Sequence, residues 1–169
     1  MPRPAGDAYP PFYDTYVRLV PEEDLSAALS RSVHELESDL SRIPENMGDH
    51  AYAAGKWTIR ELLQHAIDTE RIFAYRALCI ARGEKQALPG FDENAYAREA
   101  GAGHVSLSDL KEELLLCRRS TVRLFRGFPE KAMERTGTAN GQPISVLALG
   151  YIMIGHWRHH KGVIEERYI

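Results

Sequence analysis

Four segments of the chain repeat apolar residues at intervals of three and four positions, and this spacing restricts the fold more than any other feature. Side chains at these intervals lie along one side of an α-helix. The spacing predicts four helices, over residues 21–43, 58–82 and 106–126 and from 145 almost to the C-terminus. Each helix must bury its apolar side against another element. The sequence therefore predicts an all-α fold built as a helical bundle.

Residues at the ends of these segments support the boundaries. Pro21 can begin a helix without losing a hydrogen bond, and Pro44 ends the first helix. Gly83 follows the second helix as a typical terminator. Ser106 is placed to cap a free backbone amide of the third helix, and Asp109 favours the positive end of its dipole.

The connectors between the predicted helices are long. Residues 44–57, 84–105 and 127–144 carry most of the internal Gly, Pro and Asn and are predicted to be loops. Connectors of this length can cross the end of a bundle or run back along it. Residues 1–20 are too aromatic for an ordinary disordered tail, and we expect this N-terminal extension to pack on the bundle domain of residues 21–169.

Size and charge narrow the class of protein. A chain of 169 residues, 44% hydrophobic and 27% charged, suits one globular domain. A formal net charge of -3 argues against nucleic acid as a partner. No stretch approaches the roughly 18 consecutive apolar residues that cross a bilayer, and the start lacks the apolar core of a secretory signal, so we expect a cytoplasmic protein that does not enter membranes. Cys79 and Cys117 form no C-x-x-C pair and are expected to be reduced core thiols.

Two of the predicted helices carry polar residues within the apolar stripe. The stripe of the second helix is Leu62, His65, Thr69, Ile72, Arg76 and Cys79. The stripe of the fourth helix is Leu149, Met153, His156, His160 and Val163. Three histidines therefore lie where a bundle should be apolar.

The spacing of these histidines suits a metal ion. His156 and His160 project from one side of a helix a turn apart, and a bundle can bring His65 opposite that pair. Three neutral imidazoles suit zinc or nickel above all, with iron, cobalt or manganese also possible, better than magnesium or calcium. Three protein ligands leave coordination positions open for water or substrate, as in catalytic sites.

Other interpretations of the histidines remain open at this stage. A lone histidine on an apolar face is more often hydrogen-bonded core than ligand. His159 also lies three residues from His156, but it falls beside the stripe. His34, His50 and His104 are weaker candidates, because they flank a stripe or lie in loops.

Established metal and nucleophile motifs are absent. The sequence has no H-E-x-x-H motif, and Glu61 precedes His65 by four positions instead of the three of the E-x-x-H pairs in di-iron bundles. It has neither a phosphate-binding G-x-x-x-x-G-K-[ST] loop nor a G-x-S-x-G nucleophile elbow.

Several neighbours of the histidines have two interpretations each. Arg76 would either bind an anionic substrate group or form a salt bridge with a carboxylate such as Glu70. Asn140 would either contact substrate at the open end of the bundle or belong to a plain turn. Trp57 is expected to stabilise the start of the second helix rather than to contact substrate. Asp68, like Glu61, is expected on a solvated helix face. The alternative for both, and for Thr69, is to orient an imidazole or to accept a substrate proton.

The chain resembles the DinB/YfiT-like superfamily over about residues 51–168. The residues that carry the resemblance are KWTIRELLQH at 56–65, ERIFAYRA at 70–77, LPGFDEN at 88–94 and GHWRHH at 155–160. The family pattern of one histidine on the second helix and an H-x-x-x-H pair on the fourth is matched by His65, His156 and His160. Gln64 departs from the small residue expected in close relatives, and it either narrows the approach to the metal or points outward.

The resemblance implies a four-helix bundle in up-down-down-up order and frequent homodimers. Characterised members of the family include enzymes that use low-molecular-weight thiols such as bacillithiol or mycothiol, and others described as hydrolases, so the resemblance implies an activity of one of these kinds. We therefore expect a metal-dependent enzyme acting on a small molecule, with thiol S-transfer as the first hypothesis and hydrolysis as the second. Arg76 and Asn140 would contact the substrate. The hypothesis from another class is a non-catalytic module that binds a metal or small ligand in stress protection.

Overall fold

Four long helices form the body of the computed structural model, which describes residues 3–169. The long helices are α2 (Leu25–Ser41), α3 (Ile59–Ala81), α5 (Leu107–Arg126) and α7 (Val146–Arg167). The sequence prediction of an all-α four-helix bundle is confirmed, apart from a small two-stranded sheet. No helix in this part of the chain is long and apolar enough to cross a bilayer.

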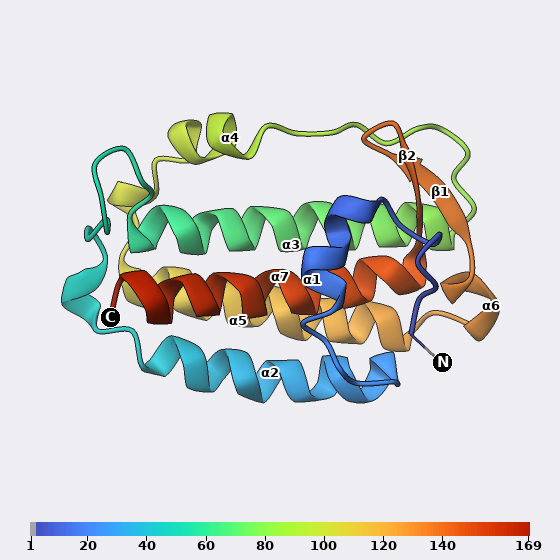
Figure 1. The fold of residues 1–169 in the computed structure, drawn as a ribbon, viewed down its shortest axis with the longest axis horizontal. Coiled ribbons are helices and arrows are strands. Elements are labelled where there is room, and N and C mark those ends of the chain that lie inside the picture. Colours follow the sequence, from blue (N-terminus) through green and yellow to red (C-terminus); the bar gives the residue numbers. More distant parts are fainter. Residues whose placement is uncertain (1–2) are drawn as a thin grey trace.

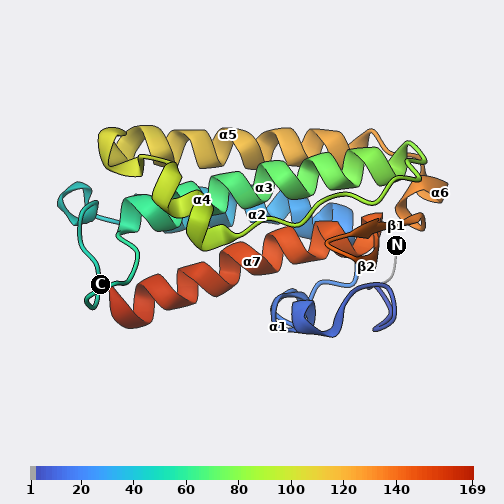
Figure 2. The same ribbon diagram turned by 90° about the horizontal axis from the view of Figure 1, so that it is seen from above.

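The helices follow the up-down-down-up order (Figure 1). Helices α3 and α5 run in one direction, and α2 and α7 run in the other. Helix α3 packs on α5 and α7, and α2 packs on the same two helices, so the four surround one core. Because α3 and α5 are parallel, their connector must return along the whole bundle. Figure 2 shows this connector passing over α3.

The predicted helix starts are confirmed for three of the four helices. Thr58 and Glu61 form a reciprocal capping box before α3, and the Ser106 hydroxyl accepts from the backbone N–H of Asp109. The first predicted helix start is wrong, because α2 begins at Leu25 and not at Pro21. The Asp24 carboxylate accepts from the Ala27 backbone N–H and caps the helix there.

The long connectors contain more structure than predicted. The short helices in them are α4 (Glu93–Glu99), α6 (Glu130–Met133) and the 3-10 turns η2 (Glu45–Met47) and η3 (Ala102–His104). Strands β1 (Thr136–Ala139) and β2 (Gln142–Ser145) pair antiparallel around Asn140 and Gly141. Both of these turn residues have positive φ, 51° and 72°, as a type I′ turn requires.

The N-terminal residues cross the outside of α7, where Figure 2 shows them as a separate layer. They form η1 (Pro11–Tyr13) and α1 (Asp14–Val17). Tyr9, Tyr13 and Val17 are buried in this layer. The domain boundary after residue 20 stays a prediction, and residues 1–2 of the predicted extension lie outside the described part of the chain.

A layer of buried polar side chains divides the apolar core into two clusters, one toward each end of the bundle. Each long helix contributes to this layer, through Ser32 on α2, Glu70 on α3, Arg118 on α5 and His156 on α7. Burying a polar group lowers the stability of the fold unless the group is paired, so four polar side chains in one layer indicate a structural or functional role for that layer. His156, a candidate metal ligand predicted from the sequence, belongs to this layer.

Candidate metal centre

The three predicted histidines converge at the middle of the bundle. His65 lies on α3, and His156 and His160 lie one turn apart on α7. His156 Nε2 lies 3.1 Å from His65 Nε2 and 3.0 Å from His160 Nε2. One ring nitrogen from each histidine lies within 4.8 Å of the other two, which is close enough for one ion to contact all three.

Hydrogen bonding alone cannot satisfy this cluster. A ring nitrogen carries either one proton or one lone pair in the ring plane, so His156 Nε2 can form only one good hydrogen bond of its two close contacts. A cation at the centre would use all three lone pairs. Nitrogen ligands about 2.0–2.1 Å from one ion, at angles of about 90–110°, lie about 2.9–3.4 Å apart, which matches the separations of 3.1 and 3.0 Å between His156 Nε2 and the other two nitrogens. The donor set therefore fits a transition metal.

Burial keeps these imidazoles neutral at pH 7. Desolvation lowers the pKa of His65 to about 4 and that of His160 to about 3. The pKa of His156 is also well below 6.5, because its ring is buried and faces the other two histidines. Neutral imidazole is the form that binds metals.

The histidines open into a cavity of about 340 Å³. Its walls are mainly aromatic and come from four parts of the chain, with the contributing rings Phe12, Tyr13, Tyr16, Trp57, Phe73 and Phe91. The Trp57 ring centroid lies 4.8 Å from that of His65, so Trp57 faces the cavity as well as preceding α3. The Tyr16 ring meets that of His156 edge-on at 5.3 Å. The rings of the N-terminal segment were not identified as site residues from the sequence.

Thr69 places a polar group in the same cavity. It lies one turn beyond His65 on α3 and lines the cavity. Its Oγ1 is buried and makes no hydrogen bond within the described part of the chain. A hydroxyl left in this way costs about 1–3 kcal/mol, so Oγ1 is suited to bind a polar atom of a ligand.

Arg76 lines the cavity, and its predicted alternative, a salt bridge with Glu70, is wrong. Glu70 instead accepts two 2.8 Å hydrogen bonds from the guanidinium of Arg118. Arg76 Nη2 donates a 2.6 Å hydrogen bond to the carbonyl oxygen of Pro89, and its guanidinium lies 5.2 Å from the centroid of the Phe73 ring. Arg118, which sequence reasoning missed, pairs with the carboxylate that was one of the two alternatives for Arg76.

Asn140 reaches the same cavity from the tip of the hairpin. Backbone hydrogen bonds join Leu88 to Thr138 and Asn140, and so fix the connector between α3 and α4 to β1. A Cβ atom on Gly90 would overlap the Asn140 side chain, so the two segments are in close contact. The structure thus brings both predicted substrate contacts, Arg76 and Asn140, to the cavity that holds the histidines. It also shows that Asn140 belongs to a turn, so both interpretations apply.

The other polar candidates lie elsewhere. Glu61 is occupied in the capping box, and Asp68 accepts a 2.9 Å hydrogen bond from Gln64 Nε2. None of these three residues lines the cavity, so Gln64 does not narrow the approach to the histidines. His159 lies next to the cluster, with its ring centroid 5.2 Å from that of His160, but it is not among the three convergent ligands.

Gly155 allows the N-terminal segment to approach the histidines. A Cβ atom at this position would overlap the backbone carbonyl of Tyr16, which cannot move as a side chain can. We expect Gly155→Ala to lower the free energy of unfolding by about 1–3 kcal/mol, as overpacking does, in urea unfolding followed by circular dichroism. Gly162 on the same helix has open space around it, so Gly162→Ala should raise stability by about 0.5–1 kcal/mol. Equal effects of the two substitutions would contradict the close packing at Gly155.

Comparison with known proteins identifies one family and solved structures with a similar fold. The family model described as the DinB superfamily matches residues 28–164. No curated protein sequence matches the chain. The fold is similar to that of YfiT from Bacillus subtilis, described as a probable metal-dependent hydrolase with an unusual four-helix bundle topology. The TM-score is 0.73 with 17% identity, over 97% of this chain and 90% of that one.

A second fold similarity is to a mycothiol-dependent maleylpyruvate isomerase. Its structure gives a TM-score of 0.63 with 16% identity, and a histidine-to-alanine variant gives 0.65 with 15%. The similarity covers 80% of this chain but only 57% of the isomerase. At these identities the similarities establish the shared bundle and no common activity.

Proposed function

The chain belongs to the DinB superfamily, and from that membership and the geometry of the cavity we propose a metal-dependent enzyme acting on a small molecule. His65, His156 and His160 would hold one divalent transition metal, zinc or nickel foremost. The observation that carries this proposal is the convergence of three neutral imidazoles on a cavity with room for a ligand. A closed structural site would leave no such space. The predicted homodimer and cytoplasmic location are part of the same proposal.

The proposed reaction is thiol S-transfer. A bound divalent metal supplies Lewis acidity that lowers the pKa of a thiol or water it binds toward neutrality. The sulfur then forms a bond to an electrophilic carbon, the leaving group departs with its electron pair, and the thiol proton passes to solvent. No protein nucleophile is required. The isomerase with the similar fold is described as mycothiol-dependent, which favours a thiol cosubstrate here.

The residues of the cavity would serve three purposes in this reaction. Thr69 Oγ1 has an unused hydrogen-bonding capacity, so it can orient the attacking group one turn from His65. Arg76 and Asn140 would contact the electrophile. The aromatic rings exclude water and strengthen the electrostatic interactions within the site.

Hydrolysis is the second candidate, because YfiT is described as a probable metal-dependent hydrolase. In this reaction water would take the place of the thiol at the same site. The histidines and the cavity serve both reactions, so the identity of the nucleophile separates them.

Turnover with and without metal tests the proposal. We expect the metal-loaded protein to conjugate 1-chloro-2,4-dinitrobenzene with at least one thiol among bacillithiol, mycothiol, glutathione and cysteine, and the metal-stripped protein to lose this activity. The measurement is the absorbance of the conjugate against time. Metal-dependent cleavage of 4-nitrophenyl esters without thiol would favour the hydrolase. Tight ligand binding with no turnover of any thiol or ester would contradict both and favour the non-catalytic module.

A further inference from the structure

One side of α3 carries a series of different chemical groups along the cavity. His65 is followed at intervals of four, four and three by Thr69, Phe73 and Arg76, and all four line the cavity. Eleven residues turn a helix through about 1100°, only about 20° beyond three full turns, so His65 and Arg76 lie on the same side. The histidines and a guanidinium thus occupy separated positions along one cavity.

We infer that this cavity binds an elongated anionic substrate, with a carboxylate held by Arg76 away from the histidines and a flat apolar body between. The inference rests on the proposed function and names the substrate class of that same site. It makes Arg76 a specificity-determining residue.

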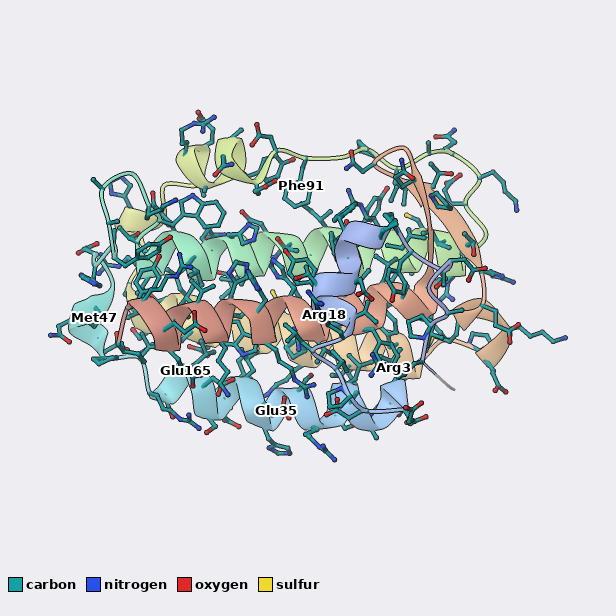
Figure 3. The ribbon with its side chains drawn as sticks, in the orientation of Figure 1. Arg3, Arg18, Glu35, Met47, Phe91 and Glu165 are labelled. Atoms are coloured by element: carbon teal, nitrogen blue, oxygen red, sulfur yellow. The ribbon has the colours of Figure 1, made fainter. Side chains whose placement is uncertain are left out.

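Arg76 has no compensating negative charge. In the part of the chain that the structure describes, no carboxylate lies within ion-pair distance of its guanidinium, although Arg76 is only 3% exposed. Its hydrogen bond to Pro89 uses a neutral acceptor, and the rings of Phe73 and Phe91 lie 5.2 and 5.9 Å from it. Figure 3 shows Phe91 projecting from its connector toward α3. Desolvation lowers the pKa of Arg76, but a guanidinium stays charged, so an anion from outside would relieve the cost of burying it.

The acidic residue of the cavity does not neutralise Arg76. Glu93 lines the cavity and acts on the pKa values of His65, Tyr13 and Tyr16, in each case upward. It forms no ion pair with Arg76 among the described residues.

The dimensions of the cavity set the length of the substrate. A separation of 11 residues corresponds to about 16 Å along the helix axis. Subtracting the metal–nitrogen bond of about 2 Å and a hydrogen bond of about 3 Å at the other end leaves at most about 11 Å for the molecule itself. The aromatic walls between the two ends favour a flat or aromatic body.

A pair of probes that differ only in charge tests the inference. 5-Phenylpentanoate and 5-phenylpentanamide share one body, and isothermal titration calorimetry gives the Kd of each with the metal-loaded and the metal-stripped protein. We expect the carboxylate to bind at least tenfold more tightly than the amide in both forms. A preference that appears only when metal is present would place the carboxylate on the metal and overturn the inference.

Substitutions at two arginines on α3 locate the preference. We expect Arg76→Gln to weaken carboxylate binding about 10- to 100-fold, as loss of a charged hydrogen bond does, and to change amide binding less than twofold. Arg76→Lys keeps the charge and should retain most of the preference, which separates loss of charge from a folding defect. Arg71→Gln is the matched control, because Arg71 is 55% exposed and pairs with Glu113 outside the cavity. An unchanged preference in Arg76→Gln would overturn the inference.

The orientation of the bound 5-phenylpentanoate can be measured by proton relaxation in the wild-type protein. With Co²⁺ or Mn²⁺ in place of the native metal, protons of the phenyl end should relax faster than those beside the carboxylate. The reverse order would overturn the inference. An Arg76-dependent preference without any catalytic turnover would support the anionic subsite while contradicting the proposed reaction, so the two failures are distinguishable.

Discussion

His156→Ala is expected to abolish stoichiometric metal binding while the protein stays helical. His156 is the central ligand, since its Nε2 lies 3.0–3.1 Å from both other imidazole nitrogens. Without it, His65 and His160 would remain as two ligands on different helices. Loss of a group that only hydrogen-bonds a ligand costs about 10- to 100-fold in metal affinity, and loss of a ligand itself should cost more. Metal content after gel filtration, measured by mass spectrometry, checks this result.

His159→Ala is the matched control for this prediction. His159 lies on the same helix and touches the His160 ring, but it does not belong to the convergent cluster. The His159→Ala variant should therefore keep close to one metal ion per chain, whereas His65→Ala and His160→Ala should lose the metal. Circular dichroism establishes that each variant is folded. Metal retained by both His65→Ala and His156→Ala would rule out the three-histidine site.

The helices were predictable because their determinants are local. The apolar stripes and the capping residues Thr58, Ser106 and Ser145 act within a few positions of themselves, and the structure confirms each of these helix starts. The small hairpin was missed because its strands have only four residues each and show no alternation of apolar residues. The Asn140–Gly141 pair was the available signal for it.

The walls of the cavity could not be predicted in the same way. His65, His156 and His160 stand out because each is a polar residue in an apolar stripe. Tyr16 and Phe91 lie in segments without helical periodicity, and they reach the site only because the N-terminal segment crosses α7 and the α3–α4 connector returns along the bundle. These paths depend on long-range contacts such as that between Gly155 and Tyr16.

Glu70 posed a different difficulty. Glu70 and Arg76 lie six positions apart on α3, which places them about 120° apart around the helix and about 9 Å apart along it. The structure selects Arg118 because α5 packs directly on α3. Only residues three or four positions apart are neighbours on a helix, so the spacing itself disfavoured the pair of Glu70 and Arg76, whereas the partner on α5 could not be identified without the packing of the helices.

The buried pair of Glu70 and Arg118 leads to the largest expected effect on stability. Both side chains are at most 4% exposed, and Arg118 Nη2 also donates a 3.0 Å hydrogen bond to the Met153 carbonyl on α7. Removing one partner leaves an uncompensated charge in the core. Glu70→Ala and Arg118→Ala should each lower the free energy of unfolding by about 3–5 kcal/mol, measured by urea unfolding.

A surface pair on the same helix is the control. Arg119 follows Arg118 in sequence, and its ion pair with Glu37 spans 3.5 Å with both side chains more than half exposed. Arg119→Ala should therefore change stability by less than about 1 kcal/mol. Similar losses for Arg118→Ala and Arg119→Ala would contradict the special role of burial.

The double variant Glu70→Leu, Arg118→Met separates the contribution of the ion pair to stability from its contribution to the positioning of the histidines. Replacing a buried ion pair by apolar residues of similar size is often neutral, or stabilising by about 1–4 kcal/mol, and Arg118 Nη1 already lacks a partner in the described structure. This variant should therefore recover most of the stability that the single substitutions lose. Because Glu70 lies five residues after His65 and Met153 three before His156, the pair also joins the two helices that carry the histidines. We expect the double variant to be stable but to bind metal more weakly than the wild-type protein, and wild-type metal affinity would show that the pair does not position the site.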